Sequence, residues 1–149
     1  MTSIHRHALA PYTPEQMFEL VDNVNAYPEF LPWCGSSQEI SRTEDEVKAS
    51  VELARGSIRK SFTTLNRLQK NKMIEMKLVE GPFRRLEGFW RFAPLKDGQA
   101  CKISLDLEFD FSNRLVALAI GPVFHSVADS LVDAFVKRAH VCYGGRGEG

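Results

Sequence analysis

The chain has 149 residues, of which 44% are hydrophobic, and its formal net charge is zero. A chain of this length buries roughly two-thirds of its unfolded surface, which is enough for one core without disulfides or metal ions. The neutral charge argues against a DNA-binding protein, and three widely spaced cysteines, Cys34, Cys101 and Cys142, argue for free thiols in a reducing compartment.

The N-terminal residues are expected to form a strand, a helix and an aromatic connector. Residues 3–10 have the pattern of a short strand. A helix is predicted to begin after Thr13, because Pro14 suits the first helical position and Gln16 completes a capping box. Two prolines restrict residues 27–33, which we expect to form a connector with at most a single short helical turn.

Two-residue periodicity predicts antiparallel strands through the middle of the chain. Alternation is most regular over 101–111, where every odd position is apolar. The other predicted strands are 47–53, 58–68, 74–78 and 86–93, separated by turns at Gly56, 70–72, 81–82 and 96–98. An unbroken run of strands excludes βαβ units, so the predicted fold class is α+β.

From about Asn113 to Tyr143 the apolar residues change to helical spacing, which predicts one long amphipathic helix. Gly121 and Pro122 are expected to kink it, and we place the opening of a cavity near that kink. The stripe expected to face water consists of His125, Asp129, Asp133, Lys137 and His140. A glycine-rich tail over 144–149 is expected to be disordered, which leaves residues 1–143 as a single domain.

A curved antiparallel sheet of about six or seven strands around this helix, with one or two short helices after the first strand, encloses an interior too wide for side chains alone. An apolar interior of this kind can hold a hydrophobic ligand. Aromatic residues from four separate segments are expected to converge there. The candidate cavity residues are Phe30, Trp33, Phe83, Leu86, Trp90, Phe92, Ile120, Val123, Phe124, Val127 and Leu131.

Neither a catalytic nor a metal site is predicted. His5 and His7 share one face of a strand but have no evident third ligand, and His125 with Asp129 has no nucleophile motif nearby. Cys34 has no evident base beside it, so we expect a buried structural thiol. The phosphate-binding, zinc-protease and serine-hydrolase motifs are absent from the sequence.

Positive charge is concentrated in the middle of the chain. Residues 55–91 carry a net charge of +7 and the rest of the chain −7. Solvated strand faces and turns are the favoured interpretation, and contact with anionic lipid headgroups or RNA phosphates is the alternative. The candidate basic patch consists of Arg59, Lys60, Arg84 and Arg85. Phe83, next to two of these cations, is expected to be exposed in a way that suits a membrane interface.

Two motifs resemble the coenzyme Q-binding START-like family, within the polyketide cyclase/START superfamily. They are VNAYPEFLPWC at 24–34 and GPFRRLEGFWRF at 81–92, together with the strand 105–111 that leads into the last helix, and the resemblance covers residues 2–143. It implies the helix-grip fold and a hydrophobic cavity that binds ubiquinone or a similar polyprenyl lipid, with no required cofactor. On this reading the protein supports respiratory electron transport.

The family's bacterial branch includes a ribosome-association toxin, so the resemblance also implies an alternative function. A protein of that kind would bind the large ribosomal subunit and block subunit joining. Trp33 beside Cys34 resembles the quinone-binding members, whereas the basic segment 55–91 suits a ribosomal or an anionic membrane surface equally. Polyketide cyclase-like activity is the enzymatic alternative within the superfamily.

The expected location is the cytoplasm, with peripheral contact at the inner face of the cell membrane. No apolar signal stretch follows the basic residues near the start of the chain, and no uninterrupted apolar run approaches the ~18 residues that span a bilayer. The expected partners are therefore a hydrophobic small molecule, a membrane surface or the large ribosomal subunit.

Overall fold

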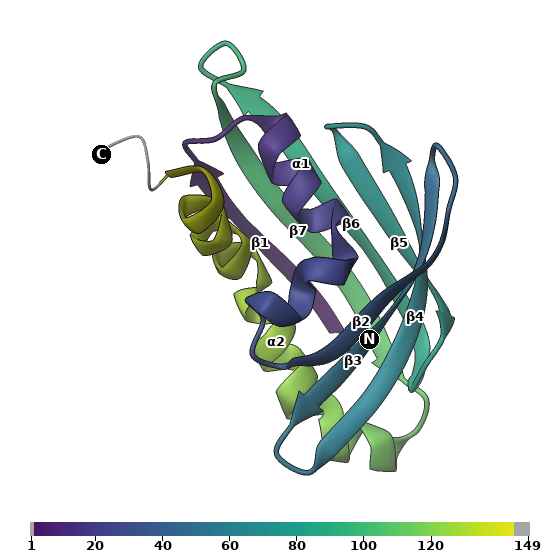
Figure 1. Ribbon diagram of the computed structural model, residues 1–149. Coiled ribbons are helices and arrows are strands. Elements are labelled where there is room, and N and C mark those ends of the chain that lie inside the picture. Colours follow the sequence, from purple (N-terminus) through teal and green to yellow (C-terminus); the bar gives the residue numbers. More distant parts are fainter. Residues whose placement is uncertain (1, 145–149) are drawn as a thin grey trace.

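The strands form one antiparallel sheet that curves around the C-terminal helix (Figure 1). A computed structural model describes residues 2–144 of the chain. The seven strands are β1 (Thr2–Ala10), β2 (Cys34–Arg42), β3 (Glu46–Arg55), β4 (Ile58–Gln69), β5 (Met73–Glu80), β6 (Phe83–Leu95) and β7 (Ala100–Phe111), in the spatial order β1-β7-β6-β5-β4-β3-β2. The predicted α+β class and its helix-grip arrangement are confirmed.

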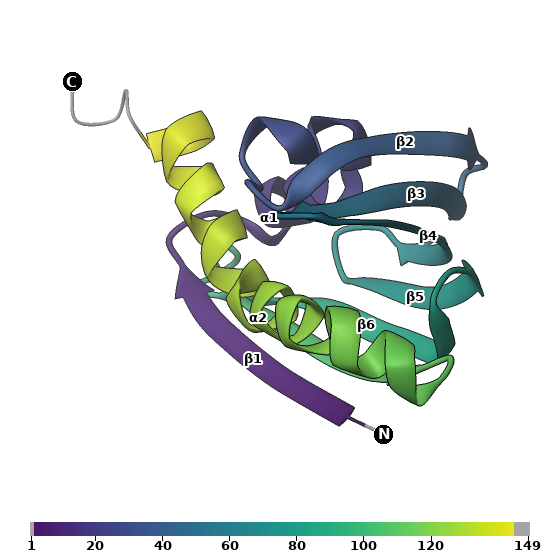
Figure 2. The same cartoon turned by 90° about the horizontal axis from the view of Figure 1, so that it is seen from below.

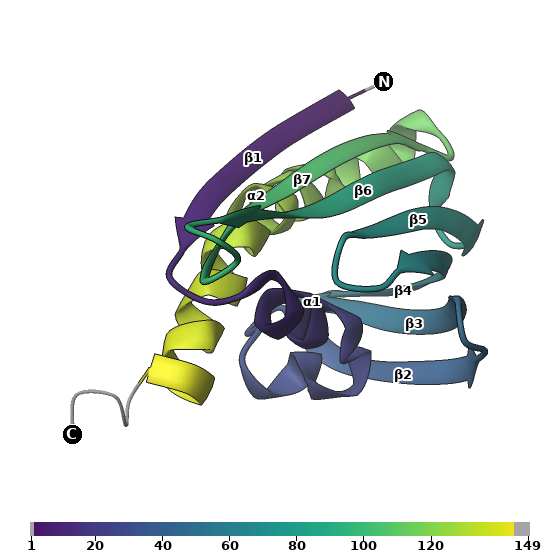
Figure 3. The same ribbon diagram turned by 90° about the horizontal axis from the view of Figure 1, so that it is seen from above.

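The first strand pairs with the last, so the chain must cross from one edge of the sheet to the other after β1. Helix α1 (Pro14–Asp22) and the 3-10 helix η1 (Val24–Glu29) make that crossing on the same side of the sheet as the C-terminal helix (Figure 3). The predicted capping box is confirmed, since the Gln16 amide donates to Thr13 Oγ1 at 3.0 Å and the Thr13 amide donates to Gln16 Oε1 at 2.9 Å. The 3-10 helix begins at Val24, before the predicted connector, and includes residues 27–29 of it, so the single short turn expected within 27–33 is confirmed.

Strand β2 is the element that the sequence pattern did not reveal. It lies at the edge of the sheet, and most of its residues are at least partly exposed. Its register against β3 shifts between Cys34 and Ser36 and again between Glu39 and Ser41. Each shift inverts the alternation of inward and outward side chains, so no two-residue period is visible.

Helix α2 (Arg114–Ala139) crosses the concave face of the sheet and continues as the short π-helix η2 (His140–Gly144). The Asn113 side chain caps its first turn by accepting from the Val116 amide at 2.9 Å. Its axis changes direction along its length (Figure 2). The predicted polar stripe is confirmed as exposed. Residues 145–149 of the predicted disordered tail lie outside the described residues.

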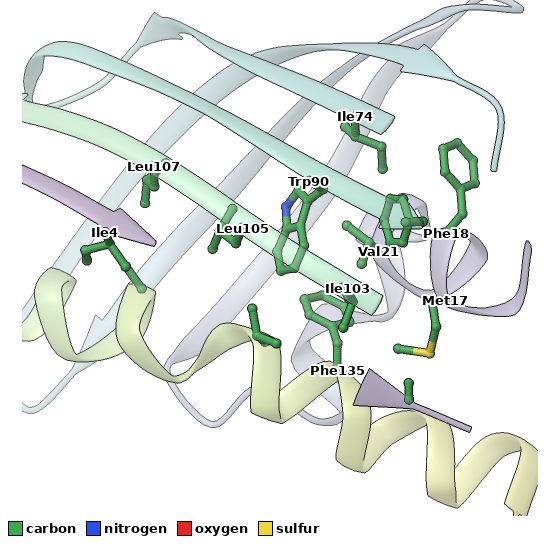
Figure 4. Close-up of a cluster of buried hydrophobic side chains, with 14 of the residues drawn as sticks. Ile4, Met17, Phe18, Val21, Ile74, Trp90, Ile103, Leu105, Leu107 and Phe135 are labelled. Carbon is green, nitrogen blue, oxygen red and sulfur yellow. The ribbon is translucent and has the colours of Figure 1, made fainter. Parts of the chain in front are cut away.

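The buried face of α2 repeats every three or four residues and consists of Ile120, Phe124, Val127, Ala128, Val132, Phe135 and Ala139. Phe135 is the centre of this contact (Figure 4). Its ring centroid lies 5.5 Å from that of Tyr27, 5.3 Å from that of Phe30 and 5.3 Å from that of Trp90. One helical side chain therefore joins η1, the connector and β6 to α2.

We expect Phe135→Ala to destabilise the protein by about 3–5 kcal/mol, because it removes a buried aromatic ring and leaves a cavity. Chemical denaturation followed by circular dichroism measures this change. Val141→Ala is the control, since Val141 is 73% exposed, and a loss of more than about 0.5 kcal/mol there would contradict our account of the helix contact.

Candidate ligand cavity

A cavity of about 90 Å³ lies between the concave face of the sheet and α2. Strands β3 to β7 contribute its floor, and η1, the connector and α2 contribute its walls. The lining residues are mostly apolar: Val24, Tyr27, Trp33, Ala49, Val51, Leu53, Phe62, Thr64, Asn66, Met76, Leu86, Trp90, Leu107, Phe124, Val127, Ala128, Leu131 and Phe135. The lining contains no charged side chain.

The few polar side chains of the lining are held in fixed positions. The Tyr27 hydroxyl donates to the Val21 carbonyl at 2.5 Å, and burial raises the pKa of Tyr27, so the phenol stays neutral. Thr64 and Asn66 point from the same face of β4 and are both buried. Thr64 Oγ1 donates to Asn66 Oδ1 at 2.8 Å.

A larger groove of about 800 Å³ adjoins this cavity on the outside. Its walls are the Glu29–Trp33 segment and the face of α2 and η2 between Ser126 and Val141. Arg138 ties the two walls together, because its guanidinium lies 2.8 Å from Glu29 Oε1 and 4.8 Å from the ring centroid of Phe30.

Trp33 and Val127 line both the groove and the cavity, so these two side chains stand between them. Small-molecule sites commonly measure ~300–1,000 Å³. The volume of the inner cavity is below that range, whereas the volume of the groove falls inside the range. We predicted an opening near Gly121 and Pro122, but the groove runs along the later half of α2, because the Glu29–Trp33 connector meets the helix there.

Some of the predicted cavity residues line the cavity and others do not. Those on the lining are Trp33, Leu86, Trp90, Phe124, Val127 and Leu131, and Phe30 lines the groove. Phe92 is instead packed against Phe18, with ring centroids 5.6 Å apart. Ile120 is buried one turn before the cavity, and Val123 is only half-buried on the flank of α2.

Phe83 corrects two expectations, since it neither lines the cavity nor is exposed. It is buried and lies 4.9 Å from Phe124 between ring centroids. The register of β6 against β7 shifts between Phe83 and Arg85. This bulge turns the aromatic ring into the core and leaves both arginines outside.

Besides Val24, Tyr27, Leu107, Ala128 and Phe135, the sequence analysis missed the seven lining residues that come from strands β3, β4 and β5. These residues are Ala49, Val51, Leu53, Phe62, Thr64, Asn66 and Met76. A signal was available, because they occupy alternate positions of strands that were themselves predicted. Thr64 and Asn66 were overlooked because polar residues were assigned to the outer face.

The basic patch is largely neutralised by acidic residues on the same strand or on neighbouring strands. The pairs are Arg59 with Glu52 at 3.5 Å, Arg84 with Asp110 at 3.4 Å, and Arg85 with Glu87 at 2.8 Å and with Glu108 at 3.7 Å. Among residues 2–144, Lys60 is the patch member without an ion pair. The +7 segment of the sequence is therefore not a uniformly cationic surface.

No cluster of three or more His, Cys, Asp or Glu side chains that could hold a metal ion occurs among the described residues. His5 instead contacts Asp106, with 2.7 Å between Nδ1 and Oδ1, on the outer face of the sheet.

The sequence matches the family of polyketide cyclase/dehydrase and lipid transport proteins over residues 10–136. It is 46% identical to the ribosome association toxin RatA of Pseudomonas aeruginosa over 96% of this chain and 99% of that one, and 44% identical to RatA of Escherichia coli over 98% and 92%. It is 29% identical to the mitochondrial coenzyme Q-binding protein COQ10 of Dictyostelium discoideum, over 89% of this chain and 66% of that one.

Solved structures show the same fold. An 18 kDa protein of Caulobacter crescentus is 32% identical and superimposes with a TM-score of 0.74, over 97% of this chain and 99% of that one. The Zhui aromatase/cyclase of a Streptomyces species is 12% identical, with a TM-score of 0.81 over 97% and 98%. At that identity the likeness to the cyclase shows the fold alone.

We expect the three thiols to differ in reactivity. Burial raises the pKa of the Cys34 thiol and raises that of Cys101 to about 11, whereas Cys142 is exposed. At pH 8, a colorimetric thiol reagent should modify one cysteine rapidly in the native protein and all three after unfolding. Cys142→Ser should abolish the rapid reaction, and rapid modification of Cys34 in that variant would contradict its assignment as a buried structural thiol.

Proposed function

Because the chain belongs to the polyketide cyclase/dehydrase and lipid transport family, we propose that it binds a hydrophobic ligand between its sheet and α2. We propose that this ligand is ubiquinone or a similar polyprenyl lipid, and that the protein serves respiratory electron transport as its carrier or chaperone. The observation that carries the proposal is an interior cavity without charged side chains that adjoins an open groove. The coenzyme Q-binding relative supports the choice of ligand.

The size of the cavity constrains how such a ligand binds. At about 90 Å³ it has the volume of roughly three water molecules, so a polyprenyl tail does not fit inside it as it stands. The tail would instead lie along the groove and reach inward once Trp33 and Val127 separate. Each buried CH₂ contributes about 0.8 kcal/mol, so affinity should depend more on tail length than on the head group.

We propose binding rather than catalysis. General acid–base chemistry needs a titratable group near the substrate. Tyr27 is the titratable side chain on the cavity lining, and its hydroxyl is already donated to Val21. A cyclase-like reaction in this cavity would lack a carboxylate or a histidine.

We expect Ala49→Leu to reduce the amount of co-purifying lipid several-fold, because three additional carbon atoms fill most of the inner cavity. Ser50→Leu is the matched control, since Ser50 is the next residue and points to the opposite face of β3. Lipid extraction and mass spectrometry of the purified proteins measure the difference. Wild-type protein that repeatedly carries no lipid would contradict the proposed function.

Association with the large ribosomal subunit is the second candidate function. Relatives that share 44–46% of their residues with this chain, over 92–99% of their own length, are named ribosome association toxins. The binding surface would be the basic patch, because exposed ion pairs are weak and an arginine can exchange a carboxylate for a phosphate at little cost. Both candidate functions would operate in the cytoplasm.

Contact with a membrane would give the cavity access to its ligand. Leu115 and Leu118 at the start of α2 are 77% and 72% exposed. The Ser112 amide donates to the Pro82 carbonyl at 3.1 Å, which places this end of α2 beside the start of β6 with Arg84 and Arg85. By length and composition alone Arg114–Gly144 could span a bilayer, and 28% of its most apolar window is buried. We propose peripheral docking through this end, since the rest of α2 covers the sheet.

We expect charge reversal of Arg59, Lys60, Arg84 and Arg85 to abolish sedimentation with large ribosomal subunits while leaving the lipid content unchanged. Binding by the wild type should weaken steeply with salt, because each neutralised phosphate releases counterions. Ala49→Leu should have the opposite effect on the two measurements.

The control for the charge-reversal experiment is Lys96→Glu, at the opposite end of β6 from the patch. If wild-type protein does not sediment with the large subunit at low salt, the ribosomal function is wrong. If the reversed variant loses only its binding to anionic vesicles, the patch is a membrane docking surface.

A further inference from the structure

Asn66 has two hydrogen-bond donors that the protein leaves unused. Its side chain is 91% buried on the floor of the cavity, since its exposed fraction is 9%. Its Oδ1 atom accepts a hydrogen bond from Thr64 Oγ1 at 2.8 Å. No residue in the described part of the chain accepts a hydrogen bond from Nδ2.

Trp90 has a third unused donor. It is 2% exposed and lines the same cavity. Within residues 2–144 no oxygen accepts from its Nε1 atom. The indole nitrogen lies on the side of the ring turned toward Leu105 and Leu107 rather than toward Phe18 (Figure 4).

The nitrogen atoms Asn66 Nδ2 and Trp90 Nε1 both border open space. Every fully enclosed side-chain nitrogen and oxygen among the described residues has a hydrogen-bond partner. The unpartnered nitrogens of Asn66 and Trp90 must therefore be in contact with a space, and for two buried residues of the lining that space is the cavity.

The register of the sheet places the two side chains on the same inner face, two strands apart. Asn66 is opposite Met76, Met76 is opposite Gly88, and Trp90 is the next inward-facing residue after Gly88. A Cβ atom at Gly88 would lie 2.9 Å from Met76 Cε and 2.8 Å from Leu107 Cδ1. The missing side chain at Gly88 thus lets Met76 and Leu107 pack against the backbone of β6.

We infer that Asn66 and Trp90 form a hydrogen-bonding site for a neutral ligand that carries a carbonyl oxygen. The unused groups are donors, so the ligand must supply the acceptor. A carboxylate or phosphate is excluded, because the lining has no cation to compensate a buried charge. The carbonyl oxygen of a ketone, an ester or a quinone is a neutral hydrogen-bond acceptor of this kind.

This inference rests on the proposed function, since it names the chemistry that the ligand must present to the cavity. Ordered water is the competing occupant, because a cavity of this volume can hold about three molecules. Water would satisfy the same donors but would create no preference for a carbonyl.

Three small aromatic probes of similar shape test the inference: acetophenone, isopropylbenzene and benzoate. They place a carbonyl, no polar group or a charge at the same position, and each is larger than the inner cavity, so it must also extend past Trp33 and Val127 into the groove. Two-dimensional ¹H–¹⁵N NMR titrations of the full chain give dissociation constants and report directly on the side-chain N–H groups. Asn66→Leu and Trp90→Phe assign the two signals.

For the wild type we expect acetophenone to bind about 3- to 10-fold more tightly than isopropylbenzene, and benzoate not to bind. Acetophenone should shift the Asn66 Nδ2 and Trp90 Nε1 proton signals downfield and leave the Trp33 indole signal less affected. Asn66→Leu and Trp90→Phe should each reduce the preference for acetophenone. Met76→Leu and Trp33→Phe are the matched controls and should change both affinities by the same factor.

Equal affinity for acetophenone and isopropylbenzene, with no downfield shift, would overturn the inference and indicate water as the occupant. Binding of benzoate would also overturn it. If none of the probes binds but lipid still co-purifies, the inference fails while the proposed function stands. If no probe binds and no lipid co-purifies, both fail.

Discussion

The structure depends on how α2 closes the concave face of the curved sheet. The seven-stranded antiparallel sheet has an apolar concave face, and α2 covers it together with α1 and η1. Phe135 fixes the distance between helix and sheet by contacting Tyr27, Phe30 and Trp90 at once. Where these large rings meet, the interior is filled, and where the shorter side chains of β3 and β4 face α2, the cavity remains.

The pairing of strands also explains why positive and negative charges alternate on the surface, although they are concentrated in different segments of the sequence. Strands β4 and β6 carry the cations of the basic patch, and their neighbours β3 and β7 carry acids at cross-strand positions. Pairs such as Arg84 with Asp110 and Arg91 with Asp106 join residues that are far apart in the sequence. A ribosomal or membrane partner must therefore compete with these internal pairs, which makes salt dependence the informative measurement.

The same closure gives the cavity its chemical selectivity. Apolar packing excludes water from most of the interior, so each polar group left inside has a large effect on what can bind there. Thr64 satisfies the oxygen of Asn66 and leaves its nitrogen free. Tyr27 is already satisfied by Val21. Hydrogen-bonding capacity therefore remains on the donor side, and a neutral acceptor fits the lining better than an anion.

The sequence by itself determined the strands with clean alternation, the capping box at Thr13 and the long final helix. These features depend on neighbouring residues, whose periodicity is visible in the chain. Edge strand β2 could not be predicted, because two register shifts interrupt its alternation. The inward turn of Phe83 depends on a bulge against β7, and the neutralisation of the basic patch depends on cross-strand partners. Only the tertiary structure decided which aromatic residues line the cavity and which fill the core, because that depends on where the axis of α2 lies over the sheet.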